Sequence, residues 1–257
     1  MSRSNPTEQL INPSKFFFEW NGGDGGFRYY DKSKGEKGER VSVPYPFDFL
    51  VLDTCVTLKG YNEPENKGYW SNEVKSMDIG KAKFTVRSKS GVECIGSYRE
   101  CKEKLGTKGL DYVASVYVAY KSKEGLVMAN LQLKGAAVGP WITFCKANDI
   151  NKIAIRVDSH TEEKKGRVSF FAPVFKAITK VNEESEKAAQ ELDKQLQAYL
   201  SSYFERQNGL NEQTLEQTVE SANKPQENRP IAAIENPAVA VTVPEFDPSA
   251  DLDEMPF

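Results

Sequence analysis

Apolar and polar residues alternate along much of the first 180 residues, and a period of two is typical of β-strands. Phe16, Phe18 and Trp20 occupy every second position before the turn-forming pair Asn21-Gly22, and an aromatic segment follows at 27–30. Asn-Gly between two alternating segments favours a tight hairpin turn. We therefore predict a β-hairpin over residues 13–31.

A second alternating run follows Pro46 and is expected to end at Gly60, because glycine weakens strand interiors. Strict alternation would place Leu50, Leu52, Val56 and Leu58 on one face and Phe49, Val51, Asp53, Cys55 and Thr57 on the other. Further strands are predicted at 81–89, 111–121, 126–134, 152–158 and 167–176, with one short helix at 135–148 between strands. Many strands and one interposed helix favour an antiparallel barrel over a βαβ arrangement.

The period changes to that of a helix at Asn182, which can cap a first turn carrying Glu183, Glu184 and Glu186. The apolar residues that follow share one helical face: Leu192, Leu196, Tyr199, Leu200 and Tyr203. Gly209 provides a stop, so the amphipathic helix is expected over 181–209. Such a helix either packs back on the barrel, which is the commoner outcome, or mediates assembly into a homo-oligomer.

Charge divides the chain into two parts. Residues 1–180 hold 29 Lys and Arg against 21 Asp and Glu, a net charge of +8, whereas residues 181–257 hold 5 against 16, a net charge of −11. Six of the 13 prolines lie beyond residue 222, which is typical of an extended linker. We therefore predict a flexible N-terminus at 1–12, one globular domain at 13–180, the helix, a disordered linker at 210–246 and an acidic tip at 247–257.

Several classes of protein are disfavoured by the composition. No run of 18 apolar residues exists and no hydrophobic signal core precedes Pro13, so we expect neither a membrane span nor secretion, but a cytoplasmic protein. The four cysteines form no C-x-x-C pair and His160 is the single histidine, which argues against a local zinc ribbon. Four reduced thiols and no cofactor are expected, while a zinc site built from distant cysteines stays open.

The C-terminal tip carries the most informative motif. Its last 13 residues contain five acids and no base, and the chain closes on Met255-Pro256-Phe257. An acidic segment that ends in exposed apolar residues has the properties of a docking peptide, because an aromatic ring can enter a pocket while the acids steer the approach. The alternative is an acidic tail that only increases solubility, on a structural or scaffolding protein.

The tip resembles the C-terminal peptide of bacterial and phage single-stranded DNA-binding proteins, in which an Asp-rich run ends in an aliphatic residue, Pro and Phe. The matching residues are Asp251, Asp253, Glu254, Met255, Pro256 and Phe257. The resemblance implies an OB-fold that coats single strands and a tail that recruits replication, recombination and repair proteins. It favours a diverged member from a tailed bacteriophage, acting in the bacterial host cell.

The body independently contains what a single-strand binder needs, namely cations for phosphates and aromatic faces on which bases stack. Four stretches supply basic or aromatic residues of this kind. One of them, the predicted strand 81–89, is expected to carry its Lys and Arg side chains on one face. The candidates are Trp20, Arg28, Tyr29, Tyr30, Lys32, Tyr69, Trp70, Lys75, Lys81, Lys83, Arg87, Lys89, Tyr117, Tyr120 and Lys121. Each of these stretches could instead be core or an ordinary solvated strand.

Catalytic interpretations have weaker support, and we expect no enzyme. The glycine-rich segment 21–26 lacks the Lys-Ser/Thr of a phosphate-binding Walker loop. Asp53 with Glu65 and Lys67 resembles the carboxylate set with which metal-dependent nucleases hold Mg²⁺, so a nuclease or recombination enzyme remains the rival hypothesis. His160 is expected in a polar surface turn.

Overall fold

A computed structural model describes residues 11–35, 37–122, 125–178 and 181–222, with side chains described up to 207. The chain divides into two units, residues 1–204 and 205–257. The first unit contains all the described strands and the first half of the long C-terminal helix, so the candidate site is built from this unit alone.

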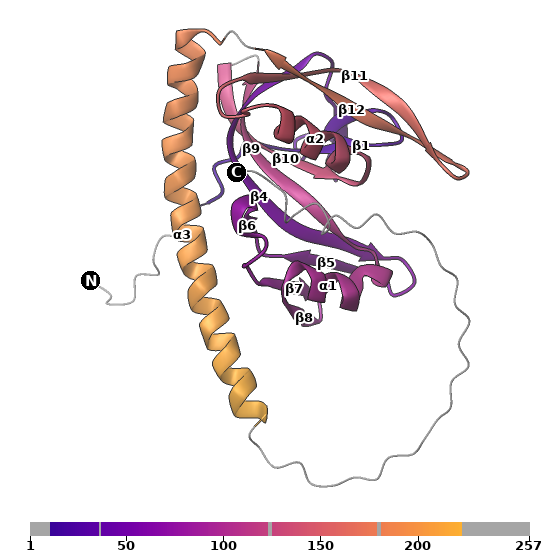
Figure 1. Ribbon diagram of the computed structural model, residues 1–257, viewed down its shortest axis with the longest axis vertical. Helices are drawn as coiled ribbons and strands as arrows, with labels where there is room; N and C mark the ends of the chain where they lie inside the picture. Colours follow the sequence, from indigo (N-terminus) through magenta and orange to yellow (C-terminus); the bar gives the residue numbers. More distant parts are fainter. Residues whose placement is uncertain (1–10, 36, 123–124, 179–180, 223–257) are drawn as a thin grey trace. The chain divides into compact units, whose positions relative to one another are not determined.

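The first unit is mainly β, as the alternation predicts (Figure 1). Twelve strands belong to one sheet, whose main path runs in the order β3-β2-β1-β10-β9-β4-β5-β7-β8. The strands are β1 (Phe16–Asn21), β2 (Gly26–Asp31), β3 (Glu39–Ser42), β4 (Phe47–Asn62), β5 (Lys67–Ser71), β6 (Val74–Lys75), β7 (Phe84–Ser88), β8 (Gly91–Gly96), β9 (Leu110–Ser122), β10 (Gly125–Lys134), β11 (Ala154–Lys165) and β12 (Val168–Ile178).

The predicted closed antiparallel barrel is not found among the described strands. The hydrogen-bonded path is open, with β3 at one end and β8 at the other, and β1 pairs with β10 in parallel. Strand β4 is the branch point of the sheet, because β9 pairs along most of one side while β11, β6 and β5 share the other. The N-terminal hairpin is confirmed, since β1 and β2 pair across the Asn21-Gly22 turn.

Strand β4 differs from the expected alternation at two positions. A bulge at Leu52 shifts the register against β9, so Phe49 and Val51 share a face with Val56 and Leu58 instead of opposing them. The strand also passes through Gly60 to Asn62. A Cβ atom at Gly60 would lie 2.1 Å from the carbonyl oxygen of Gly109, so glycine is required there by a close neighbouring backbone rather than by a strand end.

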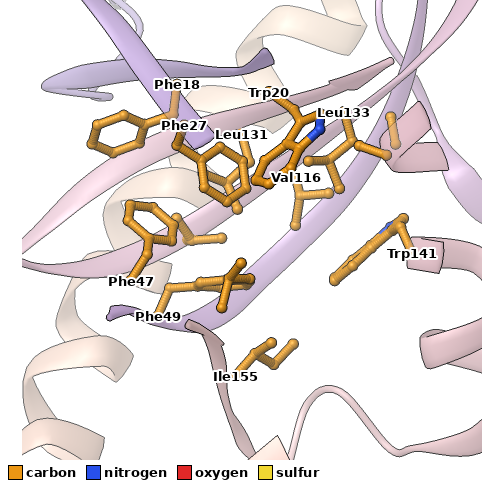
Figure 2. Close-up of a cluster of buried hydrophobic side chains, with 14 of the residues drawn as sticks. Phe18, Trp20, Phe27, Phe47, Phe49, Val116, Leu131, Leu133, Trp141 and Ile155 are labelled. Carbon is orange, nitrogen blue, oxygen red and sulfur yellow. The ribbon is translucent and has the colours of Figure 1, made fainter. Parts of the chain in front are cut away.

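The main core lies on one face of the sheet and is rich in aromatic rings (Figure 2). Phe18 packs edge-on against Phe47 with ring centroids 5.1 Å apart, and Trp20 packs the same way against Phe27 at 5.1 Å. Buried aliphatic residues of β9 and β10, including Val116 and Leu131, complete this face. Alternation along β1 therefore buries the even-numbered aromatic residues and leaves Phe17 on the opposite face.

Helices α1 (Tyr98–Leu105) and α2 (Val138–Ala147) each follow a strand. Helix α2, entered through the 3₁₀ turn η3 (Gly135–Ala137), is the predicted interposed helix, and its Trp141 lies in the main core. Helix α1 was missed from the pattern, although Ser97 and Glu100 form a capping box that marks its start. Two other 3₁₀ turns are η1 (Ser76–Asp78) and η2 (Gly106–Lys108).

Helix α3 (Glu183–Ala222) begins where Asn182 predicts, and the Asn182 side chain accepts a hydrogen bond from the Ser185 amide at 2.7 Å. It continues past Gly209, where the sequence predicted an end, and so includes the first residues of the expected linker. A glycine inside a helix costs only about 1 kcal/mol, which good helix formers on both sides can offset. None of the described helices is long and apolar enough to cross a membrane.

Strands β11 and β12 form a hairpin longer than expected. Because β11 runs to Lys165, His160 lies within a strand and not in a turn, with its ring centroid 4.6 Å from that of Phe171. Strands β3, β5, β6 and β8 were also missed, because β3, β5 and β6 have only two to five residues and β8 does not alternate strictly between apolar and polar residues.

Candidate nucleic-acid interface

The face of the sheet opposite the main core carries the polar and charged side chains. Residues directly opposite each other on neighbouring strands share a face, and the register gives one such row across five strands: Arg28, Glu19, Gln132, Ser115 and Cys55. We call this side of the sheet the outer face.

Helix α3 covers part of the outer face. Leu196 and Leu200 are buried against Cys55, Tyr117 and Met128, which confirms that the helix packs back on the sheet. Polar contacts join the two layers at the same place. The Gln197 amide donates to the Asp53 carboxylate at 2.9 Å, and the amide of Glu73 donates to the Tyr203 hydroxyl at 2.8 Å.

A buried polar network anchors the sheet beneath α3. Glu73 accepts hydrogen bonds from the Ser115 hydroxyl at 2.5 Å and from the Tyr117 hydroxyl at 2.7 Å. Burial, together with the charge and hydrogen bond of Glu73, raises the pKa of Tyr117 far above its ordinary value. Tyr117 therefore stays a neutral donor, and this part of the outer face is occupied by the helix.

An exposed aromatic ring flanked by two cations lies on strand β5. Trp70 on β5 stands opposite Lys59 on β4 and Arg87 on β7, and Lys59 lies four residues from Cys55, so all three belong to the outer face. Trp70 is 43% exposed, whereas Trp20 and Trp141 are 3% and 4% exposed. Arg87 forms no ion pair with any described residue. We call Lys59, Trp70 and Arg87 the Trp70 cluster.

A second aromatic group lies on the outer face near the other end of the sheet. Tyr30 on β2 is 53% exposed and stands opposite Arg40 on β3, while Arg28 lies two residues away on the same face. The Tyr30 ring rests against Gly38, whose φ of +77° and lack of a Cβ atom allow this approach. Arg28, Tyr30 and Arg40 form what we call the Tyr30 cluster.

Charged and polar residues lie between the two clusters. The Lys59 ammonium donates to the Gln132 side chain at 2.8 Å, and Lys134 lies 3.8 Å from Glu19. Burial lowers the pKa of Lys59. The negative charges of Glu73 and Glu19 oppose this shift, and the positive charge of Lys134 adds to it. A phosphate placed near Lys59 would therefore stabilise a cation that is partly desolvated.

Five predicted aromatic residues present no exposed ring on the outer face. Trp20 is buried, and its indole nitrogen donates to the Phe171 carbonyl at 2.9 Å. Tyr69 and Tyr117 are buried as well. Tyr29 and Tyr120 pack on the main core, where burial raises the pKa of Tyr120. Trp20, Tyr69 and Tyr117 are thus buried, and Tyr29 and Tyr120 lie on the core side of the sheet, so we leave these five out of the interface.

The predicted basic residues lie in several different parts of the fold. Arg87 and Arg28 lie in the clusters, whereas Lys75 forms an ion pair with Asp53 beneath α3. Strand β7 begins at Phe84 and buries Thr85, so the predicted one-sided basic face of 81–89 reduces to Arg87. The remaining candidates are exposed at turns or strand ends outside the clusters: Lys32, Lys81, Lys83, Lys89 and Lys121.

Sequence reasoning missed three cations of the outer face, Arg40, Lys59 and Lys134. It also missed three exposed aromatic residues, Phe17, Tyr45 and Tyr61. The alternation in β1 contained the signal for Phe17, because Phe16 and Phe18 share the buried face. Lys59 had no comparable signal, since only the pairing of β4 with β5 brings it beside Trp70.

The nuclease residues are not brought together. Asp53 lies in the middle of β4 and pairs with Lys75, while Glu65 lies in the turn after β4 and is 3.3 Å from Lys108. The nine residues from Asp53 to the end of β4 span about 30 Å. No group of three potential metal ligands occurs in the part of the chain that the structure describes.

The cysteines all lie in the described part and are free thiols, with Cys55, Cys94 and Cys101 buried. Burial raises the pKa of Cys101 and Cys145 to about 12. The predicted docking tip, residues 247–257, lies outside the described residues. Comparisons with protein families, curated proteins and solved structures find no match to this chain.

Proposed function

We propose that this protein binds single-stranded DNA without catalysis and with little sequence preference, through the outer face of the sheet. The observation that carries the proposal is the Trp70 cluster, in which an exposed indole stands between two cations on neighbouring strands. Every base has a face that can stack on an aromatic ring, and every nucleotide carries a phosphate for a cation. An open sheet face also leaves room for a continuous strand.

The C-terminal tip is assigned a second role in this proposal. It would dock replication, recombination and repair proteins through Phe257, and its acids would compete with DNA for the cations of the outer face when DNA is absent. The OB-type relationship implied by the tip belongs to the same proposal. It would have to be a distant one, because the sheet is open.

Binding of a labelled oligothymidine, measured by fluorescence anisotropy and compared with a duplex of equal length, tests the main role. The wild type should prefer the single strand. Trp70→Ala should weaken binding by about 1–3 kcal/mol, the value of one stacked base. Arg87→Ala should weaken binding and lower the slope of log affinity against log salt by about 0.7, the effect of one lost phosphate contact.

The matched control for charge is Lys152→Ala, which removes an exposed cation that pairs with Asp149 at 2.8 Å outside the outer face. It should leave both affinity and salt slope unchanged. Equal losses in Arg87→Ala and Lys152→Ala would show that only total charge matters, and would contradict an interface at the Trp70 cluster. Stronger binding to duplex would overturn the proposal as a whole.

A further inference from the structure

We infer that the outer face holds two separate stacking sites, the Trp70 cluster and the Tyr30 cluster, and that one DNA strand crosses the sheet diagonally to occupy both. This inference rests on the proposed function and specifies its ligand, a single strand long enough to reach both clusters. Both aromatic rings are exposed, both have cations on the neighbouring strands, and both lie on the same face.

The register fixes the distance between the two sites. Tyr30 on β2 and Trp70 on β5 are separated by five strand spacings in the order β2-β1-β10-β9-β4-β5, which is about 24 Å. Arg28 lies in the same cross-strand row as Cys55, so Tyr30, two residues from Arg28, lies in the row of Asp53. Asp53 is six residues along β4 from Lys59, the residue opposite Trp70. Six residues of strand add about 20 Å in the perpendicular direction. The diagonal is therefore about 31 Å.

The diagonal crosses outer-face residues of differing exposure. Val113 and Ser115 on β9 and Thr57 on β4 are buried, so the strand would contact the sheet mainly toward the two ends of the path. The helix packs on Cys55, Tyr117 and Met128, whereas Lys59, Gln132 and Arg28 on the path are half-buried rather than buried. Cations stand at intervals along it. Two acids lie near the path. Glu19 has Lys134 at 3.8 Å, so its charge is partly offset, and Glu73 accepts hydrogen bonds from Ser115 and Tyr117.

A length threshold follows from this geometry. At the spacing of about 3.4 Å per nucleotide in a stacked strand, 31 Å corresponds to about nine nucleotides, and an extended strand needs fewer. A strand of four nucleotides reaches one cluster at a time. A strand of twelve reaches both, and the second contact then benefits from the high effective concentration of a tethered ligand.

The test uses the full-length protein with oligothymidines of 4, 6, 9, 12 and 20 nucleotides, and measures affinity by anisotropy for the wild type, Tyr30→Ala, Trp70→Ala and the double variant. With the 12-mer, each single variant should lose at least tenfold in affinity. With the 4-mer, each should lose about twofold or less, because the other cluster still binds. The wild-type affinity should rise steeply up to about nine nucleotides and only gradually beyond.

Tyr30→Phe serves as the matched control, because it keeps the ring and should bind the 12-mer as the wild type does. If Tyr30→Ala changes 12-mer affinity by less than twofold while Trp70→Ala weakens it, the two-site inference is wrong and the proposed function stands. Losses in both variants that are the same for the 4-mer and the 12-mer would also overturn the inference. If no oligothymidine of any length binds the wild type, the proposed function itself fails.

Discussion

The three tryptophans show how position within a strand decides the role of a residue. Trp20 alternates in phase with Phe18 and is buried, Trp141 packs on the core from α2, and Trp70 stands on the outer face beside two cations. The same residue type therefore supports the fold twice and offers a stacking surface once. Burial also lowers the reactivity of the cysteines, because their thiolates would be poorly solvated in the core.

The reactivity of the thiols tests the burial of the cysteines. Because burial raises the pKa of Cys101 and Cys145 to about 12, both are neutral thiols at pH 8. We expect the folded protein to react slowly with a thiol reagent at pH 8, with Cys145, the least buried, reacting first. All four should react quickly in denaturant. Rapid reaction of three or more thiols in the folded protein would contradict the observed burial.

At the scale of elements, helix α3 was well predicted at its start and poorly at its end. The Asn182 cap and the apolar spacing were readable, because both act within a few residues. The continuation beyond Gly209 was not readable from a single glycine, whose penalty is small. The strands β5 and β8 were missed although each pairs with the strand just before it in the chain, β5 with β4 and β8 with β7, because neither alternates strictly between apolar and polar residues.

Shortening a buried side chain of α3 tests how much its packing on the sheet contributes to stability. Leu196 is fully buried against the sheet, so Leu196→Ala should lower the free energy of unfolding by about 2–5 kcal/mol. Gln195→Ala on the exposed side is the matched control and should change it by less than about 0.5 kcal/mol. Urea unfolding followed by circular dichroism measures both. Equal small effects would show that the helix does not depend on this contact.

At the scale of the whole molecule, the chain separates its charges. The near-neutral total combines a net charge of +8 over residues 1–180 with −11 over the remainder. Opposite charges on one chain can compete with an external polyanion, and this competition weakens as salt screens it. The average charge alone would argue against a partner that is a nucleic acid.

Deletion of residues 247–257 removes four acidic side chains and tests this competition. We expect the affinity for single-stranded DNA to be unchanged or higher than in the intact chain, with any increase larger at low salt than at high salt. Phe257→Ala keeps the acids and should leave DNA affinity unaltered. A large loss of affinity on deletion, measured by anisotropy at two salt concentrations, would refute the assigned role of the tip.

The β-rich body, the N-terminal hairpin, the interposed helix and the start of α3 could be predicted from the sequence, because alternation, turn residues and caps act over a few neighbouring positions. The candidates from the sequence include Trp70, Tyr30, Arg28 and Arg87, whose role in binding DNA stays a prediction. The fold selects which aromatic rings are exposed and which cations stand beside them. That choice depends on strand register and on the bulge at Leu52, and both arise from contacts between residues far apart in the chain.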